Sequence, residues 1–415
     1  MFQRDRSSAS LVYLLMSGVK AFANALVLTV LAIYYVTAVG MNPLQLVLAG
    51  TVFEAAILLC EVPTGVVADT FSRRLSVIIG MLILGTALVL QGLVPLVLAV
   101  MVAEVIAGVG ETFLSGATDA WLADEVGEAQ VGRVYLRAAQ LERIAGIAGM
   151  LASVGLASIQ LNLPVVFGGA LYLALGLFLA LAMPERGFRP TPRGERASWR
   201  GAFGTLSAGV RAVRGSPLLL ALLAVNLFAG AASEGFDKLW EAHLLLAFTF
   251  PALGALKPVV WFGIINIGTA LAGLAAIAIF RRRLDAISGD SVAAARALLA
   301  INALLAGSVI IFGLAGSFTL AFAALLVKAA LGALGDPLYR SWLIQQTSQR
   351  TRATVLSISS QANALGETGG GPVVGLIGTA FSLRAALVAA GVLLAPVVAL
   401  YARTIRRGVG ERVTR

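Results

Sequence analysis

The chain has 415 residues, of which 59% are hydrophobic and only 13% are charged. Apolar stretches of about 20 or more residues recur from end to end, which excludes a soluble protein and predicts membrane-spanning α-helices. The net charge of +10 comes largely from arginines in short loops between these stretches, so it does not indicate nucleic-acid binding, and the stretches lack the alternation of a membrane β-barrel.

Residues that mark enzyme centres are scarce. The chain has a single histidine, His243, and a single cysteine, Cys60, so we expect no metal site and no disulfide. It contains neither a G-x-x-x-x-G-K-[ST] phosphate loop nor an H-E-x-x-H motif. ATP-driven pumping and catalysis are therefore not expected, and neither is a cofactor.

Glycines, prolines and charge clusters divide the apolar sequence into twelve predicted spans. The spans cover residues 11–39, 44–68, 75–93, 96–121, 134–160, 164–183, 217–246, 257–280, 294–313, 317–341, 354–379 and 383–402. The sequence therefore predicts an all-α integral membrane protein.

Positive charge alternates between successive loops. The loops after the first, third, fifth and ninth spans hold no lysine or arginine. The alternate loops and the two ends hold Arg4, Arg6, Arg73, Arg74, Arg133, Arg137, Arg281, Arg282, Arg283, Arg350, Arg352, Arg406 and Arg407. The positive-inside rule then predicts a cell-membrane protein with both termini in the cytoplasm.

The longest polar stretch, residues 184–216, divides the spans into two groups of six. We expect an N-terminal bundle at 1–183, a cytoplasmic linker at 184–216 and a C-terminal bundle at 217–415. Apolar residues recur at helical spacing in the linker, which predicts a surface helix; a plain basic linker is the alternative. These residues are Trp199, Phe203, Leu206, Val210 and Val213.

The two halves resemble each other in sequence. FANA at 22–25 matches FAGA at 228–231, RRLSVI at 73–78 matches RRLDAI at 282–287, and DAWL at 119–122 matches RSWL at 340–343. The matches keep their order and their offset drifts slowly, which indicates a duplicated six-helix unit typical of secondary transporters.

A charged motif follows the second span, within EVPTGVVADTFSRRLSVIIG at residues 61–80. Its Gly65, Asp69, Arg73 and Arg74 match the G-x-L-A-D-x-x-G-R-R/K signature of the major facilitator superfamily, which the chain resembles in layout as well. The resemblance implies a drug or small-molecule efflux-like transporter with two pseudo-symmetric six-helix bundles. It also implies that the Asp and Arg hold the two halves together on the cytoplasmic side while the outside is open. The small Gly65 is expected to let a neighbouring helix come close.

Other family signatures differ. The fourth span has Glu104, followed by Gly108, where proton-coupled members carry an arginine. The fifth span lacks the proline of the antiporter motif, and a comparable GGGPVVG lies at 369–375 in the eleventh span.

Ionisable side chains interrupt the apolar spans. A charge near the middle of a bilayer costs at least about 2.5–3.5 kcal/mol, so we expect these groups to face one another or a watery cavity. They are Lys20, Glu54, Glu104, Glu111, Glu234, Asp237, Lys238, Lys328 and Glu367.

Carboxyls among these groups are candidates for carrying protons. Burial and neighbouring negative charges favour the neutral form of an acid, so one or more is expected to take up a proton near neutral pH. Glu111 and Glu104 come first, because they share one helical face with Ser115 and Asp119, and Glu234 and Asp237 follow. The substrate-cavity candidates are Lys20, Glu54, Lys328, Glu367 and Trp240. Structural ion pairs are the alternative, above all Glu234–Lys238.

Aromatic and small residues have simpler interpretations. We expect anchoring at the membrane surfaces from Tyr34, Tyr35, Trp121, Trp240, Trp261 and Trp342. We expect close helix packing at Gly146, Gly149 and Ser153 of the fifth span and at Gly366, Gly370 and Gly375 of the eleventh.

The sequence thus favours a monomeric secondary transporter that moves a small solute by alternating access, with proton-coupled efflux as the leading hypothesis. Proton-coupled uptake or uniport of a polar solute is the main alternative. A membrane enzyme or sensor on the same fold is a remote one.

Overall fold

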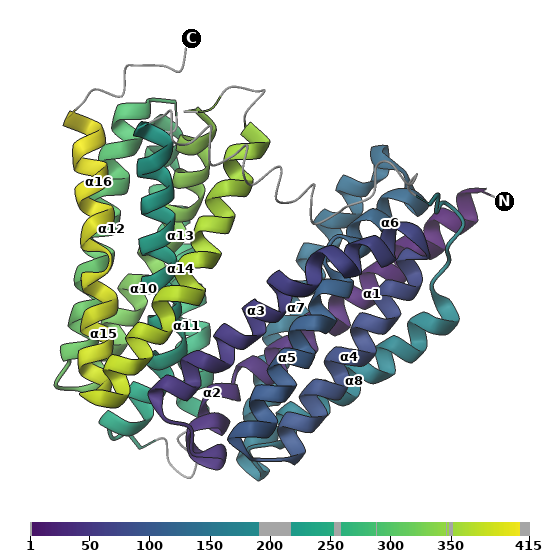
Figure 1. The fold of residues 1–415 in the computed structure, drawn as a ribbon, viewed down its shortest axis with the longest axis horizontal. Coiled ribbons are helices and arrows are strands. Elements are labelled where there is room, and N and C mark those ends of the chain that lie inside the picture. Colours follow the sequence, from purple (N-terminus) through teal and green to yellow (C-terminus); the bar gives the residue numbers. More distant parts are fainter. Residues whose placement is uncertain are drawn as a thin grey trace. The chain divides into compact units, whose positions relative to one another are not determined.

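The computed structural model describes residues 2–190, 217–252, 259–287, 289–345, 347 and 352–406 (Figure 1). All regular structure in these ranges is helical. The helices are α1 (Phe2–Leu28), α2 (Leu31–Tyr34), the π-helix η1 (Tyr35–Val39), α3 (Pro43–Thr70), α4 (Arg73–Leu93), α5 (Val97–Leu114), α6 (Ala117–Val126), α7 (Glu128–Ile159), α8 (Leu163–Ala182), α10 (Pro217–Ala247), α11 (Val259–Ile287), α12 (Ser291–Leu314), α13 (Phe318–Gln345), α14 (Arg352–Ala380), α15 (Leu383–Val392) and α16 (Ala395–Arg406).

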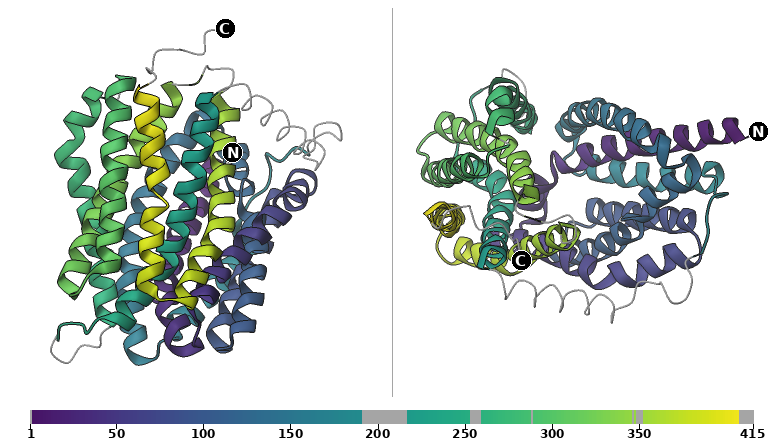
Figure 2. Two further views of the ribbon diagram at one scale, coloured as in Figure 1. Left: turned by 60° about the vertical axis from the view of Figure 1, so that its left-hand side comes forward. Right: turned by 90° about the horizontal axis from the view of Figure 1, so that it is seen from above.

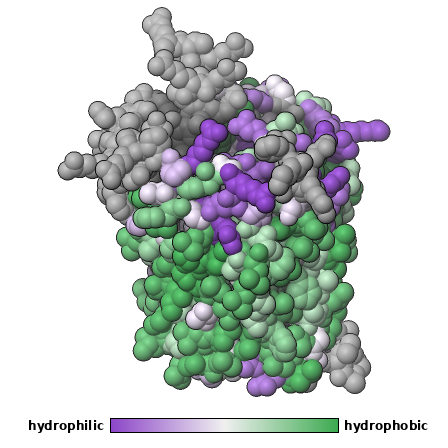
Figure 3. Space-filling model, turned by 90° about the vertical axis from the view of Figure 1, so that its right-hand side faces the viewer, coloured by the Kyte–Doolittle hydropathy of each residue, from purple (hydrophilic) through white to green (hydrophobic). Residues whose placement is uncertain are grey.

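Eleven helical segments in the described residues are long and apolar enough to cross a membrane. The remaining predicted span, the eleventh at 354–379, corresponds to α14, which is long enough but richer in glycine and polar residues. One face of the protein carries a broad apolar band with hydrophilic side chains at its ends, as expected for a chain surrounded by lipid (Figure 3). The all-α membrane fold predicted from the sequence is confirmed.

The chain forms two compact units. Unit 1 comprises residues 1–41, 52–203 and 253–263, and unit 2 comprises residues 42–51, 204–252 and 264–415. In unit 1, α1 packs along α7 and α8, and α4 packs along α8 and α5. In unit 2, α10 packs along α14 and α15, and α12 packs along α15 and α13. The same pairing of first with fifth and third with sixth span in each unit is the pattern of a duplicated bundle (Figure 2).

Small residues make the closest helix contacts, as predicted for most of them. A β-carbon on Gly149 of α7 would collide with the backbone oxygen of Phe22, and one on Gly366 of α14 with that of Leu227. Ser153 Oγ donates to the Leu26 carbonyl at 2.6 Å. The prediction is wrong for Gly146, which has open space where a β-carbon would lie among the described residues.

Several helices extend beyond the apolar spans. Arg133 and Arg137 lie in α7, and Arg281–Arg283 lie in α11, although the sequence places them in loops. The helix continues because its backbone hydrogen bonds do not require apolar side chains once the chain leaves the lipid. The predicted surface helix of the linker, at Trp199 to Val213, lies outside the described residues.

The predicted surface anchors are largely buried instead. Trp121 is 1% exposed and its Nε1 donates to the Pro184 carbonyl at 2.6 Å. Trp342 is 2% exposed and donates to the Ser291 carbonyl at 3.1 Å. Tyr34 is buried as well, and its hydroxyl donates to the Gln91 carbonyl at 2.8 Å. The anchoring prediction is wrong for these residues, because each polar tip finds a partner inside the bundle.

Candidate functional site

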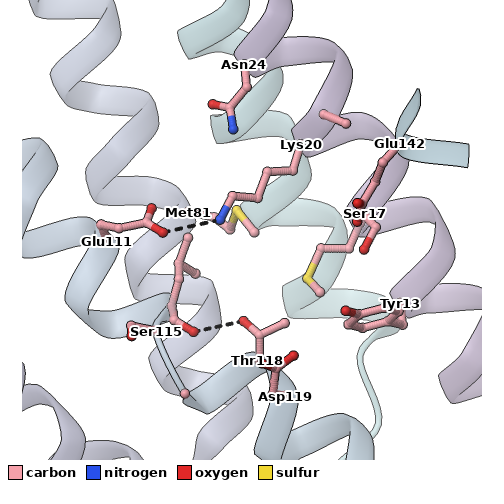
Figure 4. A pocket seen from close by; sticks show the side chains of 14 residues that line it. Tyr13, Ser17, Lys20, Asn24, Met81, Glu111, Ser115, Thr118, Asp119 and Glu142 are labelled. Atoms are coloured by element: carbon pink, nitrogen blue, oxygen red, sulfur yellow. Dashed lines mark hydrogen bonds and ion pairs between the residues drawn. The ribbon is translucent and has the colours of Figure 1, made fainter. Parts of the chain in front are cut away.

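A polar pocket of about 460 Å³ lies within unit 1 (Figure 4). Residues of α1, α4, α5, α6, α7 and the α5–α6 turn surround it. Its lining comprises Tyr13, Met16, Ser17, Lys20, Ala21, Asn24, Met81, Glu111, Leu114, Ser115, Gly116, Thr118, Asp119 and Glu142. The pocket brings together Lys20 and Glu111 of the sequence-predicted residues and adds several that the sequence did not single out.

Lys20 and Glu111 face each other across the pocket. The lysine Nζ lies 3.5 Å from Glu111 Oε1, and about one third of each side chain is exposed (31% and 36%). Lys20 comes from α1 and Glu111 from the last turn of α5. The pair is open to the pocket rather than sealed in the bundle, so both charges are available to a solute or a proton.

The predicted fourth span is broken beside this pair. Gly116 has φ +70°, a conformation that favours glycine, and it separates α5 from α6. The prediction that Glu111, Ser115 and Asp119 share one continuous helical face is therefore wrong. The break nevertheless leaves all three residues on the same pocket, and half-helices that meet at a binding site are common in transporters.

Residues of α1 and α7 complete the pocket. Ser17 and Tyr13 lie about one and two helical turns before Lys20, and Asn24 one turn after it, so they share its face. Tyr172 of α8 donates to Asn24 Oδ1 at 2.7 Å and fixes that amide. Glu142 enters from α7, and its sequence position gives no sign of this.

Glu104, the other leading proton-coupling candidate, lies away from the pocket lining. Its Oε1 accepts hydrogen bonds from the Tyr35 hydroxyl at 2.7 Å and from Gln91 Nε2 at 3.2 Å. Tyr35 is buried. Glu104 is therefore enclosed in a hydrogen-bond network, in contrast to the open position of Glu111.

The candidates of unit 2 form further ion pairs. Lys328 of α13 lies 2.8 Å from Asp237 Oδ1 of α10, and its Nζ lies 4.3 Å from the centroid of the Phe236 ring. Lys238 lies 3.8 Å from Glu234 on the same helix, as its spacing predicts. Each of the three predicted lysines thus has an acidic partner.

The remaining candidates are half-buried. Glu367 accepts a hydrogen bond from Asn363 Nδ2 at 2.7 Å, one turn before it on α14. Glu54 and Trp240 lie on α3 and α10 and are partly exposed. Glu241, which the sequence did not select, is the most buried acid of the described residues at 8% exposed.

The side chains of the charged motif after α3 form hydrogen bonds and ion pairs with other residues of unit 1. Arg73 pairs closely with Asp124 of α6 and donates to the Ala120 carbonyl at 3.1 Å, whereas Asp69 lies 3.9 Å away. Among the described residues, a β-carbon on Gly65 would meet open space, so the expected close approach does not occur there.

The motif also forms hydrogen bonds with the end of α8 and the segment that follows it. Glu185 accepts hydrogen bonds from the Ser72 hydroxyl at 2.6 Å and from the backbone N–H of Arg74 at 2.9 Å. The Arg74 guanidinium donates to the Ala180 carbonyl at 2.6 Å. Asp124 and Glu185, which the sequence did not select, are therefore the carboxylates that the motif binds most closely.

Comparison with known proteins agrees with this architecture. A family model for the Major Facilitator Superfamily matches residues 13–287. The uncharacterised MFS-type transporter YxaM of Bacillus subtilis (strain 168) is 23% identical over 372 residues, which cover 89% of each chain.

Solved structures are similar in fold. The nucleoside transporter NupG has a TM-score of 0.75 at 14% identity, with 96% of this chain and 98% of that chain covered. A bacterial homologue of the human lysosomal transporter Spinster has a TM-score of 0.69 at 17% identity, with 97% of each chain covered. Because the family model covers well over half of the sequence, the chain belongs to the Major Facilitator Superfamily and is a multi-pass membrane transporter, not an enzyme.

Proposed function

We propose that this protein is a secondary active transporter that exports a small solute by alternating access in exchange for protons. The observation that carries the proposal is the polar pocket of unit 1 with its partly exposed Lys20–Glu111 pair. The pocket volume of about 460 Å³ suits a small molecule. A charged pair inside an apolar bundle is costly, and such pairs commonly mark substrate or proton pathways.

Glu111 is the proposed proton carrier. Adding a proton to its carboxylate gives a neutral acid and removes the attraction to Lys20, so protonation changes the charge and the contacts of the pocket in one step. Glu104, Glu234 and Asp237 remain secondary candidates, because none of them lines the pocket. Lys20, Glu54, Lys328, Glu367 and Trp240 are the proposed cavity residues.

The charged motif of Gly65, Asp69, Arg73 and Arg74 is the proposed cytoplasmic gate. We propose that both termini are cytoplasmic, that the two bundles are joined by the 184–216 linker, and that the protein works as a monomer. Uptake and uniport are the alternatives. The solved relatives include transporters of nucleosides and peptides and a human organic anion transporter, and identities of 13–19% support no transfer of a substrate.

Proton flux driven by solutes tests the proposal. The purified chain is reconstituted in proteoliposomes with a pH-sensitive dye inside, and solutes of positive, negative and zero charge are added in turn. We expect one class to move protons, and Glu111→Gln to abolish that flux because the amide binds no proton. Glu128→Gln, an exposed acid of α7 outside the pocket, is the matched control.

Two results would contradict the proposal. Undiminished proton flux in Glu111→Gln would remove Glu111 from the coupling. Solute movement without any proton flux in the unchanged protein would exclude proton coupling. Everted membrane vesicles then give the direction, since an exporter accumulates its solute inside them when the interior is acidified.

A further inference from the structure

The unit 1 pocket carries an excess of negative charge. Three acids from three helices line it, Glu111 of α5, Asp119 of α6 and Glu142 of α7 (Figure 4). Lys20 is the one basic residue of the lining. With all four groups ionised, two negative charges remain uncompensated, and Coulomb attraction then favours a cationic occupant over an anionic one.

Lys20 is engaged with Glu111, so the excess lies on the other two acids. Asp119 accepts a hydrogen bond from the Tyr135 hydroxyl at 3.1 Å, a neutral donor that leaves its charge in place. Within the described part of the chain, neither Asp119 nor Glu142 forms a salt bridge with a basic side chain. Both are exposed, so a solute in the pocket can reach them.

An aromatic ring lies on the same side of the pocket. Tyr13 lines the cavity and is only 7% exposed. The Tyr135 ring packs edge-to-face against it, with centroids 5.8 Å apart, and so restricts its orientation. Aromatic rings beside carboxylates form the usual environment for protonated and quaternary amines, because both groups attract positive charge.

Part of the lining is apolar and adaptable. Met16, Met81 and Leu114 supply flexible hydrophobic surface. We propose that the pocket binds an organic cation, with its amine near Asp119, Glu142 and Tyr13 and its apolar body against these three side chains. The inference rests on the proposed function, since it names the substrate class of the same cavity.

The charge balance links this substrate to protons. A proton added to one of the pocket carboxylates removes one negative charge, which weakens the hold on a cation. One proton bound and one monocation released leave the pocket charge unchanged, so the two ligands compete and exchange becomes possible.

Two ions with the same benzyl body and opposite charge test the proposal. Benzyltrimethylammonium and benzylsulfonate are equilibrated by dialysis with the purified full chain in detergent, with protein-free micelles as background. We expect the cation to bind at least about tenfold more tightly than the sulfonate at pH 8. Equal binding of both ions, or no binding of the cation, would overturn the assignment.

Variants locate the bound cation. Asp119→Asn and Glu142→Gln are each expected to lower the affinity for the cation by roughly three- to tenfold, whereas Glu128→Gln on α7 should leave the affinity unchanged. Tyr13→Leu should weaken it by about 2- to 30-fold, and Tyr13→Phe, which keeps the ring, should not. Full affinity in the Asp119→Asn/Glu142→Gln double variant would rule out this site.

The dialysis experiment and the transport experiment test the two proposals independently. If an uncharged or anionic solute drives protons through the protein and Glu111→Gln stops it, the proposed transport stands and the cation assignment falls. If no solute drives protons but binding of the cation still requires Asp119 and Glu142, the assignment of the pocket is correct and the proposed proton-coupled transport is wrong.

Discussion

At the scale of single residues, Lys20 and Glu111 are recognisable because a charge inside an apolar stretch needs a reason. Their 3.5 Å separation, across helices that lie about ninety positions apart in the sequence, is a property of the packed bundle. Because both side chains are about one third exposed, water screens the pair, which fits a working contact better than a structural lock.

A double-mutant cycle measures how strongly this pair holds the bundle. Lys20→Met, Glu111→Gln and the double variant are unfolded by SDS titration from mixed micelles. The coupling free energy should be about 0.2–1 kcal/mol, because screening reduces the attraction. A cycle between Lys20 and the distant Glu128 should give a coupling near zero. A Lys20–Glu111 coupling above about 3 kcal/mol would identify a structural lock and weaken the proton-carrier role.

At the scale of elements, the division of the fourth span into α5 and α6 shapes the pocket. The sequence has an unbroken helical pattern through residues 96–121, and one glycine at the break gives little warning. Gly116 adopts φ +70°, and Asp119 then lines the pocket from the first turn of α6.

Alanine substitutions test the break. Gly116→Ala should destabilise the protein by about 1–2 kcal/mol, because a β-carbon disfavours this left-handed conformation although no neighbour lies within 4 Å of its position. Gly132→Ala in α7 is the matched control, since its β-carbon would also meet open space; it should stabilise the helix by up to about 1 kcal/mol. SDS titration measures both. Equal effects would show that the break is not maintained by glycine.

The charged motif is the other element whose contacts the sequence did not reveal. The resemblance implies that Asp69 and the arginines form a gate, and it does not point to Asp124 of α6, which is the carboxylate closer to Arg73 than Asp69 is. The arginine side chain is only 17% exposed, so loss of its partner leaves a poorly solvated charge.

Transport kinetics distinguish the two acids. Asp124→Asn is expected to slow turnover by roughly tenfold and Asp69→Asn by less, because the stronger contact to Arg73 is lost only in the first. Solute affinity measured by dialysis should be unchanged in both, since neither residue lines the pocket. Unchanged turnover in Asp124→Asn, or a larger effect from Asp69→Asn, would contradict this ranking.

At the scale of the whole molecule, the alternation of basic and uncharged loops and the repeated helix pairing describe the same duplicated design. The repeat was visible in the sequence as short matches such as DAWL and RSWL. Its structural counterpart is the pairing of α1 with α7 and of α10 with α14.

Cysteine labelling tests the proposed orientation. With Cys60 replaced by serine, single cysteines are introduced at Gln160, which follows α7, and at Gln130, near the start of the same helix; both positions are exposed. In intact cells an impermeant thiol reagent should label Gln160→Cys, and it should label Gln130→Cys only after permeabilisation. The reverse pattern would place the termini outside.

The sequence by itself determined the class of protein and the family and showed the internal repeat, because a bilayer demands long apolar helices and the charged motif follows the second of them. Only the tertiary structure decided which polar groups meet. Tyr13, Asn24 and Glu142 join Glu111 in one pocket, and Trp121 turns inward to Pro184. These outcomes depend on how each helix is rotated about its own axis and packed against its neighbours. Because apolar side chains lie on every face of these helices, the sequence does not specify that rotation before the bundle forms.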